Sequence, residues 1–140
     1  MNPIEINTRA DYDLCKQEGF EPLIDPRFVM ANQLRVSIQQ ELFGKGHTPE
    51  ENEKYYRWCW DHKPHYCEEC MKPLREYSAV HISHILTRGA HPAIAHDPRN
   101  FNMLCFNCHG KWENGDRESM RIYAKNEMTI KMLKNEYETL

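Results

Sequence analysis

Two pairs of cysteines in this sequence have the spacing of a metal site, and a histidine directly follows the second pair. Cys67 and Cys70 form one Cys-x-x-Cys pair, Cys105 and Cys108 form the other, and His109 comes next. A thiolate pair of this spacing can hold one edge of a metal ion, because the tight turn brings both sulfurs to one side. Two pairs complete a tetrahedron, so the spacing predicts a Zn²⁺ site that is closed and therefore structural. The alternative interpretation is four free cysteines in the core.

The polar residues around these pairs occur in a specific order. The chain runs Ser83-His84-Ile85-Leu86-Thr87-Arg88, then Asp97-Pro98-Arg99-Asn100, then Leu104-Cys105-Phe106-Asn107-Cys108-His109. This stretch resembles the HNH endonuclease family, and within it the phage-encoded, NinG-like members that have a four-cysteine zinc site. The resemblance covers about residues 65–112, and the ordered combination is specific where any one part alone is weak.

The resemblance implies a fold, a reaction and a set of roles. The family fold is a treble-clef-like ββα-metal finger, in which a two-stranded ribbon and a helix surround one divalent cation. The family reaction is hydrolysis of phosphodiester bonds in DNA, with Mg²⁺ or another divalent cation. By position, His84 matches the first family histidine, Asn100 the central asparagine and His109 the final metal-binding residue.

The chemistry of these residue types fits the same roles. A neutral histidine titrates near working pH, so His84 can take a proton from an attacking water molecule. The amide of Asn100 can hold a loop or the His84 ring without adding charge. His109 follows a predicted zinc ligand, which fixes its position, and it can ligate a cation that polarises the scissile phosphate. The alternatives are a structural role for His84 and a packing role for His109 beside the zinc site.

One position departs from the family pattern. Many members carry Asp or His just before the first histidine, as a second ligand of the catalytic cation, and this chain has Ser83 there. His81 lies on the same side of a strand as Ser83. Three interpretations stay open: His81 replaces the missing ligand, water holds the cation more loosely, or the site is impaired. Nearby, Arg88, Arg99 and Lys111 are expected to hold flanking DNA phosphates.

Two helices are predicted before the motif region. Asp25 and Pro26 have the types of an N-cap and a first helical residue, and the apolar stripe that follows ends at Gly44. Thr48 and Glu51 have the spacing of a capping box that opens a second helix. The aromatic side chains of that helix are expected to pack against the zinc module rather than stack on bases: Tyr55, Tyr56, Trp58 and Trp60.

The remaining segments give weaker patterns. Residues 1–24 fit either an entry helix or an irregular arm, and residues 78–82 weakly predict a strand. Asp116 is expected to cap a last helix with an interrupted apolar face.

Composition narrows the class of protein. The 140-residue chain has a net charge of −3, which argues against a general nucleic-acid coat protein but not against a nuclease, whose field is local. No apolar run approaches the ~20 residues of a membrane span, and the N-terminus lacks the pattern of a secretory signal. Six cysteines without such a signal favour a reducing compartment, so we expect a cytoplasmic protein, in the host cell if it is phage encoded.

These observations predict a small α+β fold: a ββα-metal core with structural zinc, flanked by N- and C-terminal helices. The expected parts are a helical extension at 1–61, the zinc module at 62–115 and a C-terminal helix at 116–140, together one compact domain. The predicted function is a metal-dependent DNA endonuclease of phage or prophage origin. The alternative is a zinc finger that binds nucleic acid, or a phage packaging or recombination partner, without cutting. A third hypothesis is a purely structural role in assembly.

Overall fold

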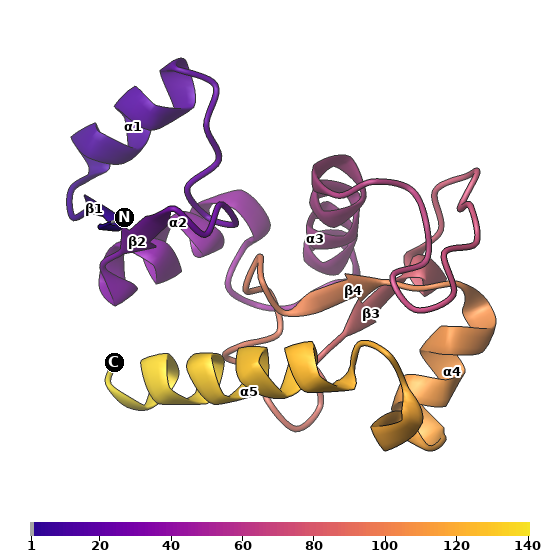
Figure 1. Ribbon diagram of the computed structural model, residues 1–140. Coiled ribbons are helices and arrows are strands. Elements are labelled where there is room, and N and C mark those ends of the chain that lie inside the picture. Colours follow the sequence, from indigo (N-terminus) through magenta and orange to yellow (C-terminus); the bar gives the residue numbers. More distant parts are fainter. Residues whose placement is uncertain (1) are drawn as a thin grey trace.

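The structure, a computed structural model, describes residues 2–140. Within them the chain forms five α-helices and two two-stranded sheets (Figure 1). The predicted α+β fold class is confirmed. No helix among these residues combines the length and the apolar character that a membrane crossing requires.

The N-terminal part is a small βαβ unit followed by a helix. Strand β1 (Ile4–Ile6) pairs in parallel with β2 (Phe28–Met30), helix α1 (Arg9–Gln17) lies between them in the chain, and α2 (Asn32–Phe43) follows. The unit has a hydrophobic cluster of its own, formed by Ile6, Tyr12, Leu23, Phe28, Met30 and Ile38.

The predicted start of a helix at Asp25 and Pro26 is wrong. Phe28 and Met30 are buried and the residue between them is exposed, which is the alternation of a strand. The carboxylate of Asp25 accepts a hydrogen bond from the backbone N–H of Arg27 at 3.0 Å and closes a turn instead of capping a helix. The helix begins only at Asn32, because β1 takes up the backbone groups of residues 28–30.

Helix α3 (Pro49–His62) begins with the predicted capping box. The backbone N–H of Glu51 donates to Thr48 Oγ1 at 3.2 Å, and the backbone N–H of Thr48 donates to Glu51 Oε1 at 3.0 Å. The buried side of the helix carries Tyr55 and Trp60, which belong to the same hydrophobic cluster as the zinc-module residue Cys67. The capping box therefore fixes the start of a helix that forms one wall of the central core.

A short ribbon and a helix form the centre of the molecule. Strand β3 (Ile82–His84) follows a 3₁₀ turn at Ala79–His81 and pairs antiparallel with β4 (Phe101–Met103), and α4 (Phe106–Asn114) follows directly. The predicted strand at 78–82 is thus displaced toward the C-terminus, because a 3₁₀ turn occupies most of it. The order strand, strand, helix is the ββα order that the sequence predicts.

Helix α5 (Tyr123–Glu138) runs below the ribbon and returns toward the N-terminal unit (Figure 1). Its buried Leu133 packs in a cluster with Leu86 and Ile94. The expectation that Asp116 caps this helix is wrong. Asp116 precedes a 3₁₀ turn at Arg117–Ser119 and makes no side-chain cap bond, and the helix starts seven residues later.

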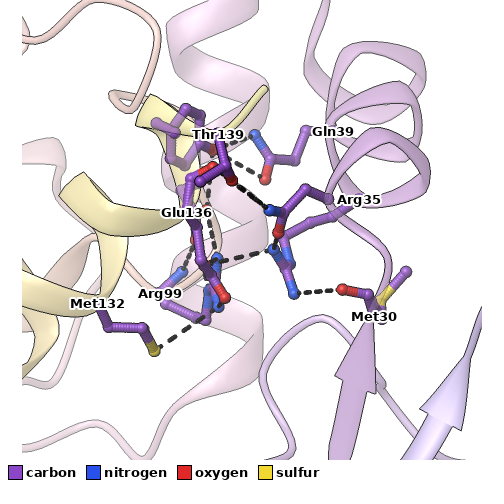
Figure 2. A network of polar contacts seen from close by, with 10 residues as sticks. Met30, Arg35, Gln39, Arg99, Met132, Glu136 and Thr139 are labelled. Atoms are coloured by element: carbon purple, nitrogen blue, oxygen red, sulfur yellow. Dashed lines mark hydrogen bonds and ion pairs between the residues drawn. The ribbon is translucent and has the colours of Figure 1, made fainter.

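A buried polar network joins α5 to α2 and to the segment before β4 (Figure 2). Arg99 Nη2 lies 2.9 Å from Asp97 Oδ2 and 2.7 Å from Glu136 Oε2, and Arg35 Nη1 lies 3.3 Å from that same Glu136 oxygen. The Tyr137 hydroxyl donates to Asp97 Oδ2 at 2.9 Å. Burial alone would raise the pKa of Asp97, but the charge and hydrogen bonds of Arg99 bring it below its ordinary value. The network therefore ties three distant segments into one body.

Candidate functional site

The four cysteines of the two Cys-x-x-Cys pairs gather at one point. Their sulfur atoms all lie within 4.8 Å of one another, and Cys70 Sγ is 3.8 Å from Cys105 Sγ. Zinc–sulfur bonds of about 2.3 Å in a tetrahedron place the sulfurs about 3.8 Å apart, so this set fits a zinc ion. The first pair lies in the loop after α3, and the second spans the start of α4. Four thiolates here can hold a metal such as zinc, as the sequence predicts.

Beside this cluster lies a cavity of about 340 Å³. It opens between α3, the ribbon and α4, and two of the residues predicted to be catalytic, His84 and His109, both line it. The lining residues are Tyr56, Ala79, Val80, Ile82, His84, Thr87, Arg88, Gly89, His109 and Glu113.

His84 ends strand β3 with its ring packed between aromatic side chains. The ring stacks on Tyr55, with centroids 5.7 Å apart and planes 17° from parallel, and meets Tyr56 edge-on at 5.9 Å. The pKa of His84 is lowered to about 4, mainly by burial and also by the charge of Arg88, while a hydrogen bond with the Ala95 backbone acts in the opposite direction. His84 Nε2 is buried and has no hydrogen-bond partner. The neutral ring can therefore accept a proton at this nitrogen.

Asn100 is fully buried and fixes the loop that follows His84. Its Oδ1 accepts a hydrogen bond from the Leu86 N–H at 2.8 Å, and its Nδ2 donates to the Leu86 carbonyl at 3.0 Å. Its own carbonyl accepts from the Ile85 N–H at 3.1 Å. Three bonds from one residue thus set the backbone immediately after the histidine, and Asn100 itself does not line the cavity.

His109 lies in the first turn of α4, between a carbonyl and a carboxylate. Its Nδ1 is 2.6 Å from the Val80 carbonyl oxygen, and its Nε2 is 2.9 Å from Glu113 Oε1. A carbonyl can only accept, so Nδ1 carries the hydrogen and the neutral ring presents a bare Nε2 to a carboxylate oxygen. Two acceptors this close need a proton or a cation between them. Neighbouring ligands of an octahedral Mg²⁺ lie about 3 Å apart, so the pair fits such an ion.

Glu113 was not predicted from the sequence. A signal for it exists, because a carboxylate four residues after a candidate metal-binding histidine lies on the same helical face. Recognising it requires knowing that residues 106–114 are helical throughout, since the family pattern ends at the histidine.

The two residues proposed as alternative cation ligands do not line the cavity. Ser83 is 0% exposed, and its side chain lies on the opposite side of β3 from Ile82 and His84, which face the cavity. The His81 ring lies nearly parallel to Trp60, at 6.1 Å between centroids. The structure thus brings His109 together with Glu113, and neither Ser83 nor His81 lines the cavity with them.

The three basic residues expected at DNA phosphates have different surroundings. Arg88 lines the cavity, is exposed, and donates to the Tyr56 hydroxyl at 3.3 Å. Arg99 lies in the network with Asp97, away from the cavity, and its placement argues against a phosphate contact. Lys111 is exposed on α4, but it lies about 160° around the helix from the cavity-facing histidine. Of the three, Arg88 alone shares the cavity with His84.

The structure thus combines a two-stranded ribbon, a helix and a thiolate cluster in a ββα arrangement, beside a cavity lined by His84, His109 and Glu113. Residues 67–115, about a third of the chain, match the family model of the HNH endonucleases. This match suggests nuclease activity and agrees with the resemblance seen in the sequence. No curated protein and no solved structure matches the chain.

Proposed function

We propose that this protein is a metal-dependent endonuclease that hydrolyses phosphodiester bonds of DNA. One observation carries the proposal: the cavity is lined both by His84, whose Nε2 has no hydrogen-bond partner, and by the His109–Glu113 pair. The base and the candidate cation site are thus available to one phosphate group. The match of residues 67–115 to the HNH model supports the same reaction.

Each residue has a separate task in this proposal. His84 takes the proton of the attacking water at Nε2, and Asn100 positions the histidine through the loop that it holds. His109 and Glu113 would hold the divalent cation, which supplies Lewis-acid stabilisation of the phosphate and of the leaving oxygen. Arg88 holds a non-bridging phosphate oxygen at the rim. The four cysteines would hold zinc and thereby fix the start of the helix that carries His109.

We also propose a phage or prophage origin, a NinG-like subtype and action in the cytoplasm. The ordered motif set supports the subtype, and six free cysteines, four of them gathered as a possible metal site, support a reducing compartment. DNA is the partner in this proposal, and packaging or recombination proteins are further candidates.

The proposal is tested with zinc-loaded protein and supercoiled plasmid in the presence of Mg²⁺ or Mn²⁺. The wild-type protein should nick or linearise the plasmid. His84→Ala should lower the rate at least 100-fold, because a positioned base contributes about 10²–10⁴-fold. Its zinc content should not change. His91→Ala is the matched control, because His91 does not line the cavity.

The cation pair is tested separately. Glu113→Gln should raise the concentration of Mg²⁺ needed for half-maximal rate, and Glu50→Gln, an exposed carboxylate on α3, should leave it unchanged. DNA binding without hydrolysis across Mg²⁺, Mn²⁺, Ni²⁺ and Zn²⁺ would instead support the non-catalytic zinc finger.

A further inference from the structure

The side chain of Phe106 is 73% exposed, although a large aromatic ring normally stabilises a fold by being buried. It lies between Cys105 and Cys108 at the first position of α4, so the thiolate cluster fixes its backbone. It takes part in none of the three hydrophobic clusters of the described residues. A rigidly held ring that contributes little to the core is available for a ligand.

The ring lies on the helical face that leads to the cavity. Phe106, His109 and Glu113 are spaced at i, i+3 and i+7, which places them along one side of α4. The buried Trp112 lies about 120° around the helix from Phe106, on the far side of His109. Gly110 lies on the exposed side next to Phe106, and an added Cβ there would meet no atom within 4 Å. The surface beside the ring is therefore open at Gly110.

The charge of the molecule limits how it can hold DNA. The chain carries a net charge of −3, and Arg88 is the one arginine or lysine that lines the cavity in residues 2–140. Release of counterions from phosphates, which drives most non-specific binding, is therefore weak here. Stacking of a base on an aromatic ring contributes about 1–3 kcal/mol per base and depends little on salt. In a continuous duplex, however, the faces of the bases are covered by their neighbours.

We propose that Phe106 stacks on an unpaired nucleobase next to the phosphate held in the cavity. The substrate class is accordingly DNA with an unpaired nucleotide: a single strand, a flap, a branch or a bulge. This inference rests on the proposed function for the position of the scissile phosphate. The base contact itself can be measured without cutting.

The experiment measures dissociation constants by fluorescence anisotropy with zinc-loaded protein and no added divalent cation. The probes are labelled oligonucleotides of one sequence, prepared as a single strand, a continuous duplex and a duplex with one unpaired nucleotide. The wild-type protein should bind the two probes with unpaired bases more tightly than the duplex. Phe106→Ala should weaken binding to those two by about 5- to 100-fold and to the duplex by about twofold or less.

Two variants keep this test decisive. Phe106→Trp should retain the binding, because it keeps an aromatic face, and Met128→Ala should not change it. Met128 is 74% exposed and lies on α5, outside the cavity lining, so it matches Phe106 in exposure alone. Equal losses on all three probes, no loss with Phe106→Ala, or no DNA binding by the wild type would overturn the proposal.

The two proposals can fail independently. A protein that nicks plasmid but binds all probes equally with and without the ring disproves the stacking role alone. A protein that binds unpaired DNA through Phe106 but never cuts it disproves the nuclease alone.

Discussion

At the scale of single residues, the surroundings of His84 favour its uncharged form. His84 is packed against Tyr55 and Tyr56, and Arg88 adds a positive charge nearby. Both burial and charge disfavour the protonated ring. The imidazole therefore remains deprotonated well below neutral pH, as the proposed role of a base requires.

The pH dependence of the reaction follows from this environment. With the pKa of His84 lowered to about 4, the neutral form dominates down to about pH 5, so kcat at saturating cation should stay nearly constant from pH 8 to 5. The rate should be halved near pH 4. Arg88→Gln removes one cause of the lowered pKa and should move this midpoint upward. A wild-type midpoint near 6.5, the value of an ordinary histidine, would contradict the assignment.

His96 is a second buried histidine, and the mechanism does not use it. Its Nε2 is 2.8 Å from Asn52 Oδ1, and its ring contacts His47, with centroids 4.3 Å apart. The pKa of His96 is lowered to about 4, mainly by burial and also by the nearby His47, His84 and Arg88, while Glu51 acts in the opposite direction. The folded state therefore accepts a proton here less readily than the unfolded state.

This difference makes stability dependent on pH. His96 takes up a proton near pH 6.5 in the unfolded chain and near pH 4 in the folded chain. The free energy of unfolding therefore has its full value above pH 6.5 and falls as the pH drops from 6.5 to 4. The difference in the pKa of His96 between the two states lowers the free energy of unfolding by about 2 to 4 kcal/mol over this range. Urea unfolding at pH 7, 6 and 5 should show a decline that is smaller in His96→Gln. Parallel curves for the variant and the wild type would show that His96 does not contribute.

The residues differ in how far they could be predicted from the sequence. The order of the motif residues along the chain predicted two things that the structure shows: the four cysteines gather, and His84 and His109 line one cavity. Their catalytic roles stay a prediction. Arg99 was expected at DNA because it is basic and near the motif. Its ion pair with Glu136 joins residues 37 positions apart, a contact that local sequence patterns do not reveal.

At the scale of elements, local sequence patterns predicted a helix start correctly where the capping side chains bond to backbone groups a few residues away. The capping box of α3 is such a signal, since Thr48 and Glu51 bond each other within four residues. The segment 28–30 was misassigned because its partner strand, β1, lies more than twenty residues earlier. Pairing over that distance overrides the local pattern of a helix start.

Helix α5 matters for the site because it holds the segment before Asn100. Arg99→Met leaves the carboxylate of Asp97 buried without its cation, so the free energy of unfolding should fall by about 3–5 kcal/mol. Chemical denaturation would measure the loss. Adding Asp97→Asn should recover part of it, because the unpaired charge is then gone. Lys111→Met, at an exposed position, should change stability by about 0.5 kcal/mol or less.

At the scale of the whole molecule, the thiolate cluster joins the loop after α3 to the start of α4. The large hydrophobic cluster beside it includes Cys67, Cys105 and Trp112. A metal held here would contribute to folding directly, because the unfolded chain has no such site.

Removal of the metal should therefore unfold the centre of the molecule. Zinc binding contributes on the order of 10 kcal/mol in small zinc domains, which is comparable to the stability of a whole domain. A chelator under reducing conditions should expose the buried Trp112 and shift the tryptophan fluorescence to longer wavelength, and zinc should restore it. Cys70→Ala should behave like the chelated protein and Cys15→Ala like the wild type, because Cys15 lies outside the cluster. An unchanged spectrum after complete metal loss would refute the structural role.

The polar network of Figure 2 also bears on when the protein becomes active during its synthesis. Asp97 and Arg99, which precede the positioning asparagine, are held by Tyr137 and Glu136. A ribosome makes the histidines and the asparagine first and the end of α5 about forty residues later. The nascent chain thus carries every proposed catalytic group before it can hold them in place. Under the proposed function, nuclease activity should therefore begin only after α5 has left the exit tunnel.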